Sequence, residues 1–153
     1  MKRATYVLLI VLTIIVLDQI TKYFIITRLS PFDSIEIFSF LHIVSVRNTG
    51  AAFGIFKSLG SSFFIIVSVF AIIFVVNLLM KRIYNTLGLS LVLGGAIGNL
   101  TDRIFYGNVV DFVDFSIGTF HWPAFNVADS ALTIGIIIIF LAHILKKSGR
   151  KWP

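Results

Sequence analysis

The chain has 153 residues, of which 58% are hydrophobic and only 13% are charged, and its formal net charge is +6. Soluble domains carry about 45–50% apolar and about 25% charged residues, so this composition excludes a soluble monomer and indicates an integral membrane protein. Because the sequence contains no cysteine, it also excludes disulfides, thiolate metal sites, iron–sulfur clusters and a catalytic thiol.

Four segments are apolar over about 20 residues, the length of helix that crosses a bilayer. They are residues 5–26, 58–80, 87–106 and 127–145. The basic N-terminus before the first apolar segment is typical of a signal peptide, but no small-residue cleavage site follows it, so we predict an uncleaved first span. We therefore predict an all-α membrane protein with four transmembrane helices, in which residues 1–153 form a single integral membrane domain.

The basic residues indicate the orientation of these spans. Eight of the thirteen lie before the first span, between the second and third, or after the fourth: Lys2, Arg3, Lys81, Arg82, Lys146, Lys147, Arg150 and Lys151. By the positive-inside rule this side is the cytoplasm, so both termini are predicted inside and the loops at residues 27–57 and 107–126 outside. Since topology accounts for the basic charge, we expect no nucleic-acid partner.

The two outer loops have different patterns. Residues 35–46 are rich in β-branched and aromatic side chains and precede the turn signal Asn48-Thr49-Gly50, which predicts a small extracytoplasmic β-like platform. The second loop sets aromatic residues among acidic ones: Phe112, Phe115, Phe120 and Trp122 among Asp111 and Asp114. This second pattern predicts an interfacial amphipathic segment.

The polar residues of the spans gather in one layer near the outer face. Asp18 lies about 20 Å above the inner end of the first span at 1.5 Å per residue, and Lys22 is one turn higher on the same helix face. The third span rises outward and the fourth descends from outside, which brings their polar residues to the same level: Asn99, Asp102, Arg103, Asn126 and Asp129, with Asp111 just beyond. Because charges inside a membrane are costly, this layer predicts a functional site.

Structural roles remain open for the same residues. Asp18 and Lys22 could form an internal salt bridge that ties helices together. Asn126 or Asp129 could serve as a helix N-cap, and the adjacent Asp102 and Arg103 could extend toward the membrane interface.

After these exclusions, catalysis by carboxylates is the form of catalysis that remains for this sequence. The histidines are scattered, no spacing fits a metal site and no serine-hydrolase motif is present, so we expect no metal and no cofactor. Two carboxylates held close together share one proton, so that one can activate water while the other polarises a carbonyl. Asp111 and Asp129 could meet in this way, although spacing alone leaves Asp102 or Asp114 as alternatives to Asp111.

Five motifs occur in chain order: DQITK at residues 18–22, RNTGAAF at 47–53, GGAIGNLTDR at 94–103, VVDF at 109–112 and FNVAD at 125–129. Together they resemble the motifs of the bacterial lipoprotein signal peptidases, also called signal peptidase II or prolipoprotein signal peptidases. The resemblance extends from the first predicted span to the fourth.

The resemblance implies a membrane-embedded aspartic endopeptidase of the bacterial inner membrane, which cleaves prolipoproteins before a diacylglyceryl-modified cysteine. It implies that Asp111 and Asp129 form the catalytic dyad. It further implies a substrate-binding or orienting role for Asn48, Gly50, Asn99, Arg103 and Asn126, and structural support from Asp18, Lys22 and Asp102. The expected partners are prolipoprotein substrates, membrane lipid and an inhibitor of the globomycin type, with no cofactor.

Two other classes fit the composition. A small proton-coupled transporter could use the carboxylates of Asp18, Asp102 and Asp129, but these should flank a pathway open to both faces, whereas the inner half of each span is uncharged. A structural scaffold subunit would leave the clustered polar residues unexplained.

Overall fold

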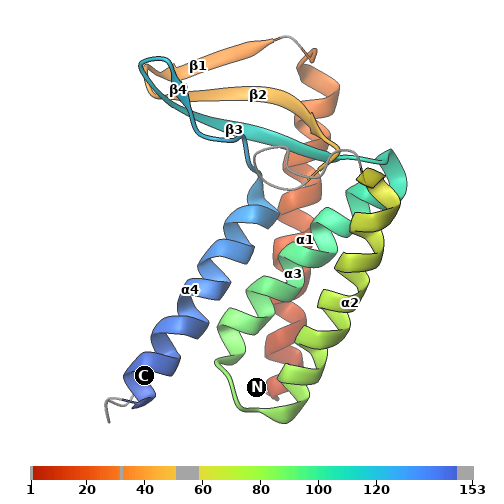
Figure 1. The fold of residues 1–153 in the computed structure, drawn as a ribbon, viewed down its shortest axis with the longest axis vertical. Helices are drawn as coiled ribbons and strands as arrows, with labels where there is room; N and C mark the ends of the chain where they lie inside the picture. The colour runs from red at the N-terminus through yellow and green to blue at the C-terminus, as the bar shows by residue number, and fades with distance from the viewer. Residues whose placement is uncertain (1, 32, 51–58, 148–153) are drawn as a thin grey trace.

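The computed structural model describes residues 2–31, 33–50 and 59–147, and these form a helical bundle that carries a sheet at one end (Figure 1). The helices are α1 (Arg3–Arg28), α2 (Gly60–Lys81), α3 (Thr86–Tyr106) and α4 (Val127–Lys147). Each predicted span overlaps one helix. The predicted start of the second span at Ser58, the motif residues 51–53 and the basic residues Arg150 and Lys151 lie outside the described residues.

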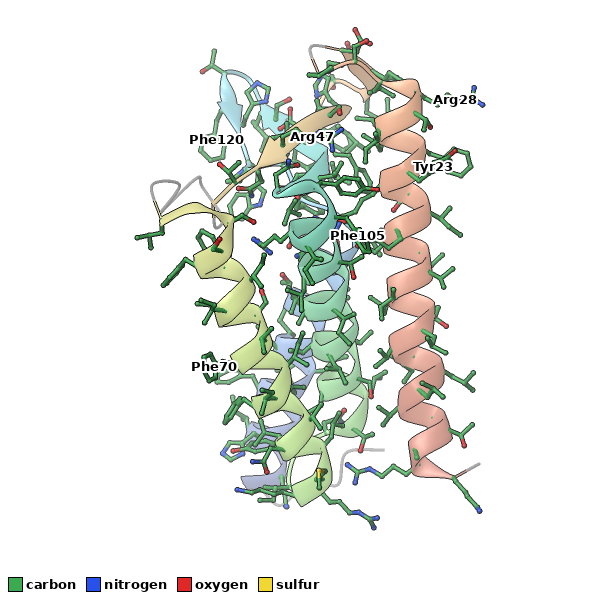
Figure 2. All side chains as sticks on the ribbon, turned by 90° about the vertical axis from the view of Figure 1, so that its right-hand side faces the viewer. Tyr23, Arg28, Arg47, Phe70, Phe105 and Phe120 are labelled. Carbon is green, nitrogen blue, oxygen red and sulfur yellow. The ribbon has the colours of Figure 1, made fainter. Side chains whose placement is uncertain are left out.

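Among the described residues, α1, α2 and α4 are the three helices long and apolar enough to cross a membrane. Many of their apolar side chains project outward, as Phe70 of α2 does with 69% of its surface exposed (Figure 2). Helix α3 differs because it lies between the others and packs against all three. A helix enclosed by protein needs no continuous apolar surface, so α3 can carry glycines and polar residues that a lipid-facing helix could not.

Glycines bring α3 and α4 into backbone contact. A Cβ atom added to Gly135 of α4 would lie 2.6 Å from the carbonyl oxygen of Gly88 on α3, and one added to Gly95 would clash with the carbonyl oxygen of Ala128. Small residues allow helices in membranes to approach this closely. The contact at Gly95 sets the first turn of α4 against the polar part of α3.

Four antiparallel strands make the sheet, in the order β1-β2-β3-β4. They are β1 (Ser34–Phe38), β2 (Leu41–Asn48), β3 (Val109–Ile117) and β4 (Phe120–His121). The predicted β-like platform is confirmed as β1 and β2, with a register shift between Ile43 and Val46 where β2 pairs with β3.

The second outer loop supplies β3 and β4, so the amphipathic segment predicted there consists of strands of the same sheet, and its position at the membrane interface stays a prediction. Pairing with β2 satisfies the backbone of β3, and its alternate apolar residues pack inward. Val110 and Phe112 join Ile25 at the top of α1 in a small buried cluster. This cluster fixes the sheet on the ends of the helices and places Asp111 directly above them.

Candidate active site

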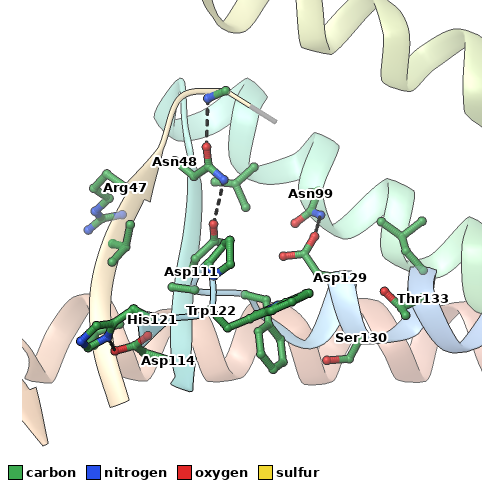
Figure 3. A pocket seen from close by; sticks show the side chains of 18 of the residues that line it. Arg47, Asn48, Asn99, Asp111, Asp114, His121, Trp122, Asp129, Ser130 and Thr133 are labelled. Carbon is green, nitrogen blue, oxygen red and sulfur yellow. Dashed lines mark hydrogen bonds and ion pairs between the residues drawn. The ribbon is translucent and has the colours of Figure 1, made fainter. Parts of the chain in front are cut away.

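A cavity of about 970 Å³ opens where the sheet meets the helices, and Asp111 of β3 and Asp129 of α4 both line it (Figure 3). The wall of this cavity also includes four of the predicted orienting residues: Asn48, Gly50, Asn99 and Arg103. Behind the wall lie the remaining predicted residues, all buried: Asp18, Lys22, Asp102 and Asn126. The fold thus brings together every site residue that the sequence suggested.

Two side-chain amides hold the Asp111 carboxylate. Asn48 Nδ2 donates to Asp111 Oδ2 at 2.9 Å, and Asn126 Nδ2 donates to Oδ1 at 2.7 Å. The oxygen of the Asn48 amide accepts a hydrogen bond from the backbone N–H of Gly50 at 3.0 Å, which fixes the orientation of that amide. Gly50 therefore acts on the site through its backbone.

Asp129 lies in the first turn of α4, where Asn126 precedes the helix. The backbone N–H of Asp129 donates to Asn126 Oδ1 at 2.8 Å, and the backbone N–H of Asn126 donates to Asp129 Oδ2 at 3.3 Å. This reciprocal pair has the form of a capping box, so Asn126, and not Asp129, takes the N-cap position. The other Asp129 oxygen accepts a hydrogen bond from Asn99 Nδ2 at 2.8 Å.

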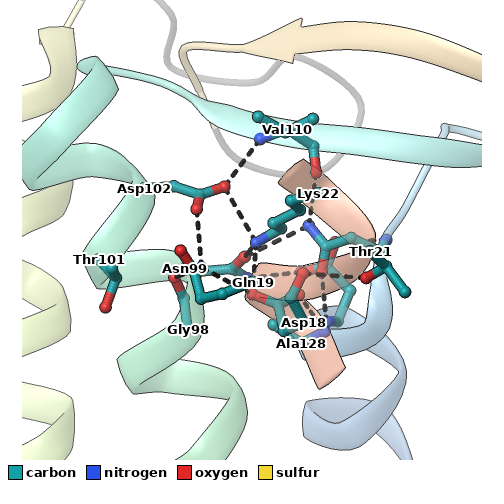
Figure 4. A network of polar contacts seen from close by, with 12 residues as sticks. Asp18, Gln19, Thr21, Lys22, Gly98, Asn99, Thr101, Asp102, Val110 and Ala128 are labelled. Carbon is teal, nitrogen blue, oxygen red and sulfur yellow. Dashed lines mark hydrogen bonds and ion pairs between the residues drawn. The ribbon is translucent and has the colours of Figure 1, made fainter. Parts of the chain in front are cut away.

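The ammonium group of Lys22 is buried between α1 and α3, behind the wall of the cavity (Figure 4). It contacts Asp18 Oδ2 at 2.8 Å, Asp102 Oδ2 at 3.0 Å and Asn99 Oδ1 at 3.0 Å. The predicted pair of Asp18 and Lys22 is confirmed. Three acceptors match the three protons of an ammonium, so burial leaves none of them without a partner.

The two carboxylates of this cluster are also bound to backbone. Asp18 Oδ1 accepts the N–H of Ala128 at 2.9 Å, and Asp102 Oδ2 accepts the N–H of Val110 at 3.0 Å. Sequence reasoning missed Gln19, which donates to Asp102 Oδ1 at 2.9 Å although it stands between two predicted residues in the first motif.

Arg103 does not pair with the neighbouring Asp102, and the idea that the two extend together to the interface is wrong. Asp102 faces Lys22 inside the bundle, because a residue one position along a helix points about 100° away. The guanidinium of Arg103 donates to the carbonyl oxygen of Gly50 at 3.2 Å and lies over the ring of Phe64. Arg103 thereby presents its charge to the cavity.

Asp114, which the sequence offered only as an alternative to Asp111, and His121, which it did not suggest, also line the cavity. His121 Nδ1 and Asp114 Oδ2 are 2.8 Å apart, and Asp114 lies on β3 three residues after Asp111. The pairing could not be foreseen, because it depends on the turn that brings β4 back against β3.

The environment of Asp111 changes its protonation. Burial, and secondarily the charge of Asp129, raises the pKa of Asp111 from 3.8 to about 7, while the hydrogen bonds from Asn48 and Asn126 act in the opposite direction. Asp111 can therefore hold a proton near neutral pH.

Within the described residues, no group of three or more histidine, aspartate or glutamate side chains could hold a metal ion.

The fold and the cavity define a helical membrane protein with a pair of carboxylates at the end of its bundle. The family model described as signal peptidase (SPase) II matches residues 10–145. The chain belongs to the signal peptidase II family, whose members are membrane proteases that process lipoproteins. This membership does not support the transporter alternative.

Relatives and solved structures agree with this membership. The lipoprotein signal peptidase of Thermodesulfovibrio yellowstonii is 49% identical, over 88% of this chain and 90% of its own length. That of Staphylococcus aureus is 42% identical, over 94% of this chain and 91% of its own length. A solved structure of a bacterial membrane enzyme superimposes with a TM-score of 0.87 at 38% identity, covering 97% of this chain and 93% of the other.

The raised pKa of Asp111 predicts how stability depends on pH. The folded chain holds this proton more tightly than the unfolded chain, whose carboxyl has the ordinary pKa of 3.8. The contribution of Asp111 to the free energy of unfolding must therefore decrease as pH rises from about 4 to about 7. Asparagine cannot titrate, so the thermal midpoint of Asp111→Asn, measured relative to wild type in detergent, should be higher at pH 8 than at pH 5.

Glu36→Gln is the matched control, because it removes an exposed carboxylate on β1. Its thermal midpoint relative to wild type should be similar at the two pH values. An Asp111→Asn variant whose midpoint follows that of the wild type at both would contradict the raised pKa.

Proposed function

We propose that this protein is an aspartic endopeptidase of the bacterial cytoplasmic (inner) membrane that removes signal peptides from prolipoproteins, cleaving before a cysteine that carries diacylglycerol. The observation that carries the proposal is the cavity in which Asp111 and Asp129, from a strand and a helix far apart in sequence, face the same space (Figure 3). Membership in the signal peptidase II family supports the substrate class.

The two aspartates are suited to peptide hydrolysis because they can share one proton between their carboxyl groups. The ionised carboxylate takes a proton from water as the water oxygen attacks the carbonyl carbon, and the neutral carboxyl donates a hydrogen bond to the carbonyl oxygen. Asp111, with a pKa of about 7, is suited to hold the shared proton. Collapse of the tetrahedral intermediate breaks the C–N bond, and the leaving nitrogen takes a proton from the dyad.

The surrounding residues would keep this pair in position. Asn48, Asn99 and Asn126 donate to the two carboxylates, so their loss would misorient the dyad. The Arg103 guanidinium, which lines the cavity, would bind a carbonyl oxygen of the substrate. The ion pairs of Lys22 with Asp18 and Asp102 lie behind these residues and would support the site without contacting the substrate.

Location at the membrane surface fits a substrate that is part lipid and part peptide. We infer that α3 crosses the bilayer with the other three helices, because it begins at their inner end and ends at the sheet (Figure 1). Residues 1–153 would then form one membrane domain with cytoplasmic termini and a site near the outer face. The same cavity would bind a globomycin-type inhibitor and adjoin membrane lipid.

Removing either aspartate tests the dyad. Asp111→Asn and Asp129→Asn should each lower the rate of cleavage of a lipidated precursor by at least about 100-fold, since asparagine can neither hold the shared proton nor act as a base. The double variant should be scarcely slower than either single variant, because residues that act as a unit are not additive. Single-turnover cleavage, with folding checked by thermal unfolding, measures both effects.

The control for this experiment is again Glu36→Gln, which lies on the exposed strand β1 and should cleave at the wild-type rate. A folded Asp129→Asn variant with near wild-type turnover would exclude the proposed dyad.

The lipid on the substrate cysteine should be required for efficient cleavage. Each buried methylene contributes about 0.8 kcal/mol, so even two methylenes in contact with the protein would change kcat/KM by about 10-fold. Purified protein incubated with lipidated and unlipidated forms of one precursor gives the comparison. Equal values of kcat/KM for the two forms would contradict this part of the proposal.

Orientation can be tested because the natural chain contains no cysteine. Thr119→Cys would place a thiol between β3 and β4, at the end of the molecule that carries the sheet. Ile83→Cys would place one between α2 and α3, at the opposite end of the helical bundle. A membrane-impermeant thiol reagent applied to intact cells should label the first variant and spare the second, which becomes reactive after lysis. The reverse pattern would put the site on the cytoplasmic side.

A further inference from the structure

Helix α4 presents one face to the cavity, and Thr133 lies at the centre of that face. The residues of α4 that line the cavity are Asp129, Ser130, Leu132, Thr133 and Ile134. At about 100° per residue these positions cover an arc of about 200°, and Thr133 is in the middle of the arc. Ala128 and Gly135, which contact α3, lie on the opposite side of the helix. The side chain of Thr133 therefore points toward the cavity and away from the packed bundle.

The hydroxyl of Thr133 has no hydrogen-bond partner among the described residues. A threonine in a helix commonly bonds to the carbonyl oxygen four residues earlier, and Thr21, Thr27 and Thr101 do so here at 2.8 Å. Ser130, the other hydroxyl of α4 in the cavity wall, also donates to a carbonyl four residues earlier. The hydroxyl of Thr133 is thus available to a ligand.

Thr133 lies one helical turn beyond Asp129, on the side away from the sheet (Figure 3). Four residues at 1.5 Å each place it about 6 Å farther along the bundle. Leu132 and Ile134, which line the cavity beside it, are apolar. Thr133 is therefore the one polar side chain that α4 contributes to the described cavity wall beyond its first turn.

Under the proposed function, on which the role of Thr133 depends, this end of the cavity receives the residues before the cleaved bond. The apolar signal peptide extends from that bond into the bilayer, along the helices. Near the dyad the peptide must be extended, so its carbonyl groups have no partner within the peptide itself. An unpaired backbone carbonyl in an apolar layer is costly, which favours a donor at this level.

The spacing of an extended peptide matches the distance from the dyad to Thr133. Such a chain advances about 3.3 Å per residue, so two residues cover about the same length as one helical turn. Carbonyl groups two residues apart in an extended chain also point to the same side. When the carbonyl under attack faces the dyad, the carbonyl of the third residue before the cleaved bond lies level with Thr133 and faces α4.

We propose that Thr133 is a substrate-positioning residue whose hydroxyl donates a hydrogen bond to the backbone carbonyl oxygen of the third residue before the cleaved bond. This bond holds the extended peptide against α4 and brings the carbonyl under attack over the dyad. It recognises the main chain, so it serves precursors with different side chains at that position. One uncharged hydrogen bond of this kind changes kcat/KM by about threefold to tenfold.

A double-mutant cycle between protein and substrate tests the proposal. Two synthetic lipidated precursors are compared, one with amide bonds throughout and one in which an ester replaces the amide that contains the carbonyl of the third residue before the cleaved bond. An ester carbonyl is the weaker acceptor, so wild-type kcat/KM should be at least about threefold lower on the ester. Thr133→Val should lower kcat/KM on the amide form and lose the sensitivity to that carbonyl, whereas Thr133→Ser should keep it.

Two controls isolate this contact. An ester placed one residue closer to the cleaved bond alters a carbonyl that points away from α4, so its effect and that of Thr133→Val should multiply. Thr13→Val makes the same substitution at an exposed threonine of α1 that does not line the cavity, and it should behave as the wild type on all three precursors. Each ratio compares two substrates on one protein, so a loss of folded protein cancels.

The outcomes separate the role of Thr133 from the proposed function. Effects of Thr133→Val and of the first ester that multiply, or a wild type that cleaves the amide and this ester equally, would overturn the role of Thr133 alone. Coupling of the same size in Thr13→Val would do the same. Failure of the wild type to cleave any lipidated precursor would overturn the proposed function as well.

Discussion

The buried ammonium of Lys22 is the constraint on which the site depends. A charge removed from water must have all of its protons bonded, and here the three acceptors come from Asp18 on α1 and from Asn99 and Asp102 on α3. The two aspartates in turn accept backbone N–H groups from the start of α4 and from β3. One cation thus connects α1, α3, α4 and β3, and the last two of these elements carry the proposed dyad.

The same constraint determines which way the neighbouring amides point. Lys22 can only donate, so the side-chain oxygen of Asn99 must face it and the NH₂ group must face outward. That NH₂ group meets Asp129 at 2.8 Å, while Asn126 uses its own NH₂ group on Asp111 at 2.7 Å. Asn126 Nδ2 also donates to the Asn99 oxygen at 3.3 Å. Asn99 and Asn126 are therefore oriented from the interior of the bundle, whereas the Asn48 amide is oriented by Gly50.

Sequence reasoning succeeded where the physics is local. The length of the apolar runs predicted the helices, and the i,i+4 spacing of Asp18 and Lys22 predicted their pair. It failed where the outcome depends on distant segments. The second outer loop became a strand because β2, more than 60 residues earlier, pairs with it, and an alternating pattern does not distinguish a paired strand from an interfacial segment. The partner of Asp102 was likewise set by the packing of α1 on α3.

The direct junction of α3 with β3 has a mechanical consequence. Only Gly107 and Asn108 separate the last turn of the helix from the strand that bears Asp111, and Gly107 has the positive φ of 71° that lets the chain turn there. Asp129 is attached to the same helix, because α4 packs on α3 backbone against backbone at Gly95. Both carboxylates are therefore attached to α3. A tilt of the bundle that matches a thinner or thicker bilayer would move Asp111 and Asp129 together and leave the distance between them unchanged.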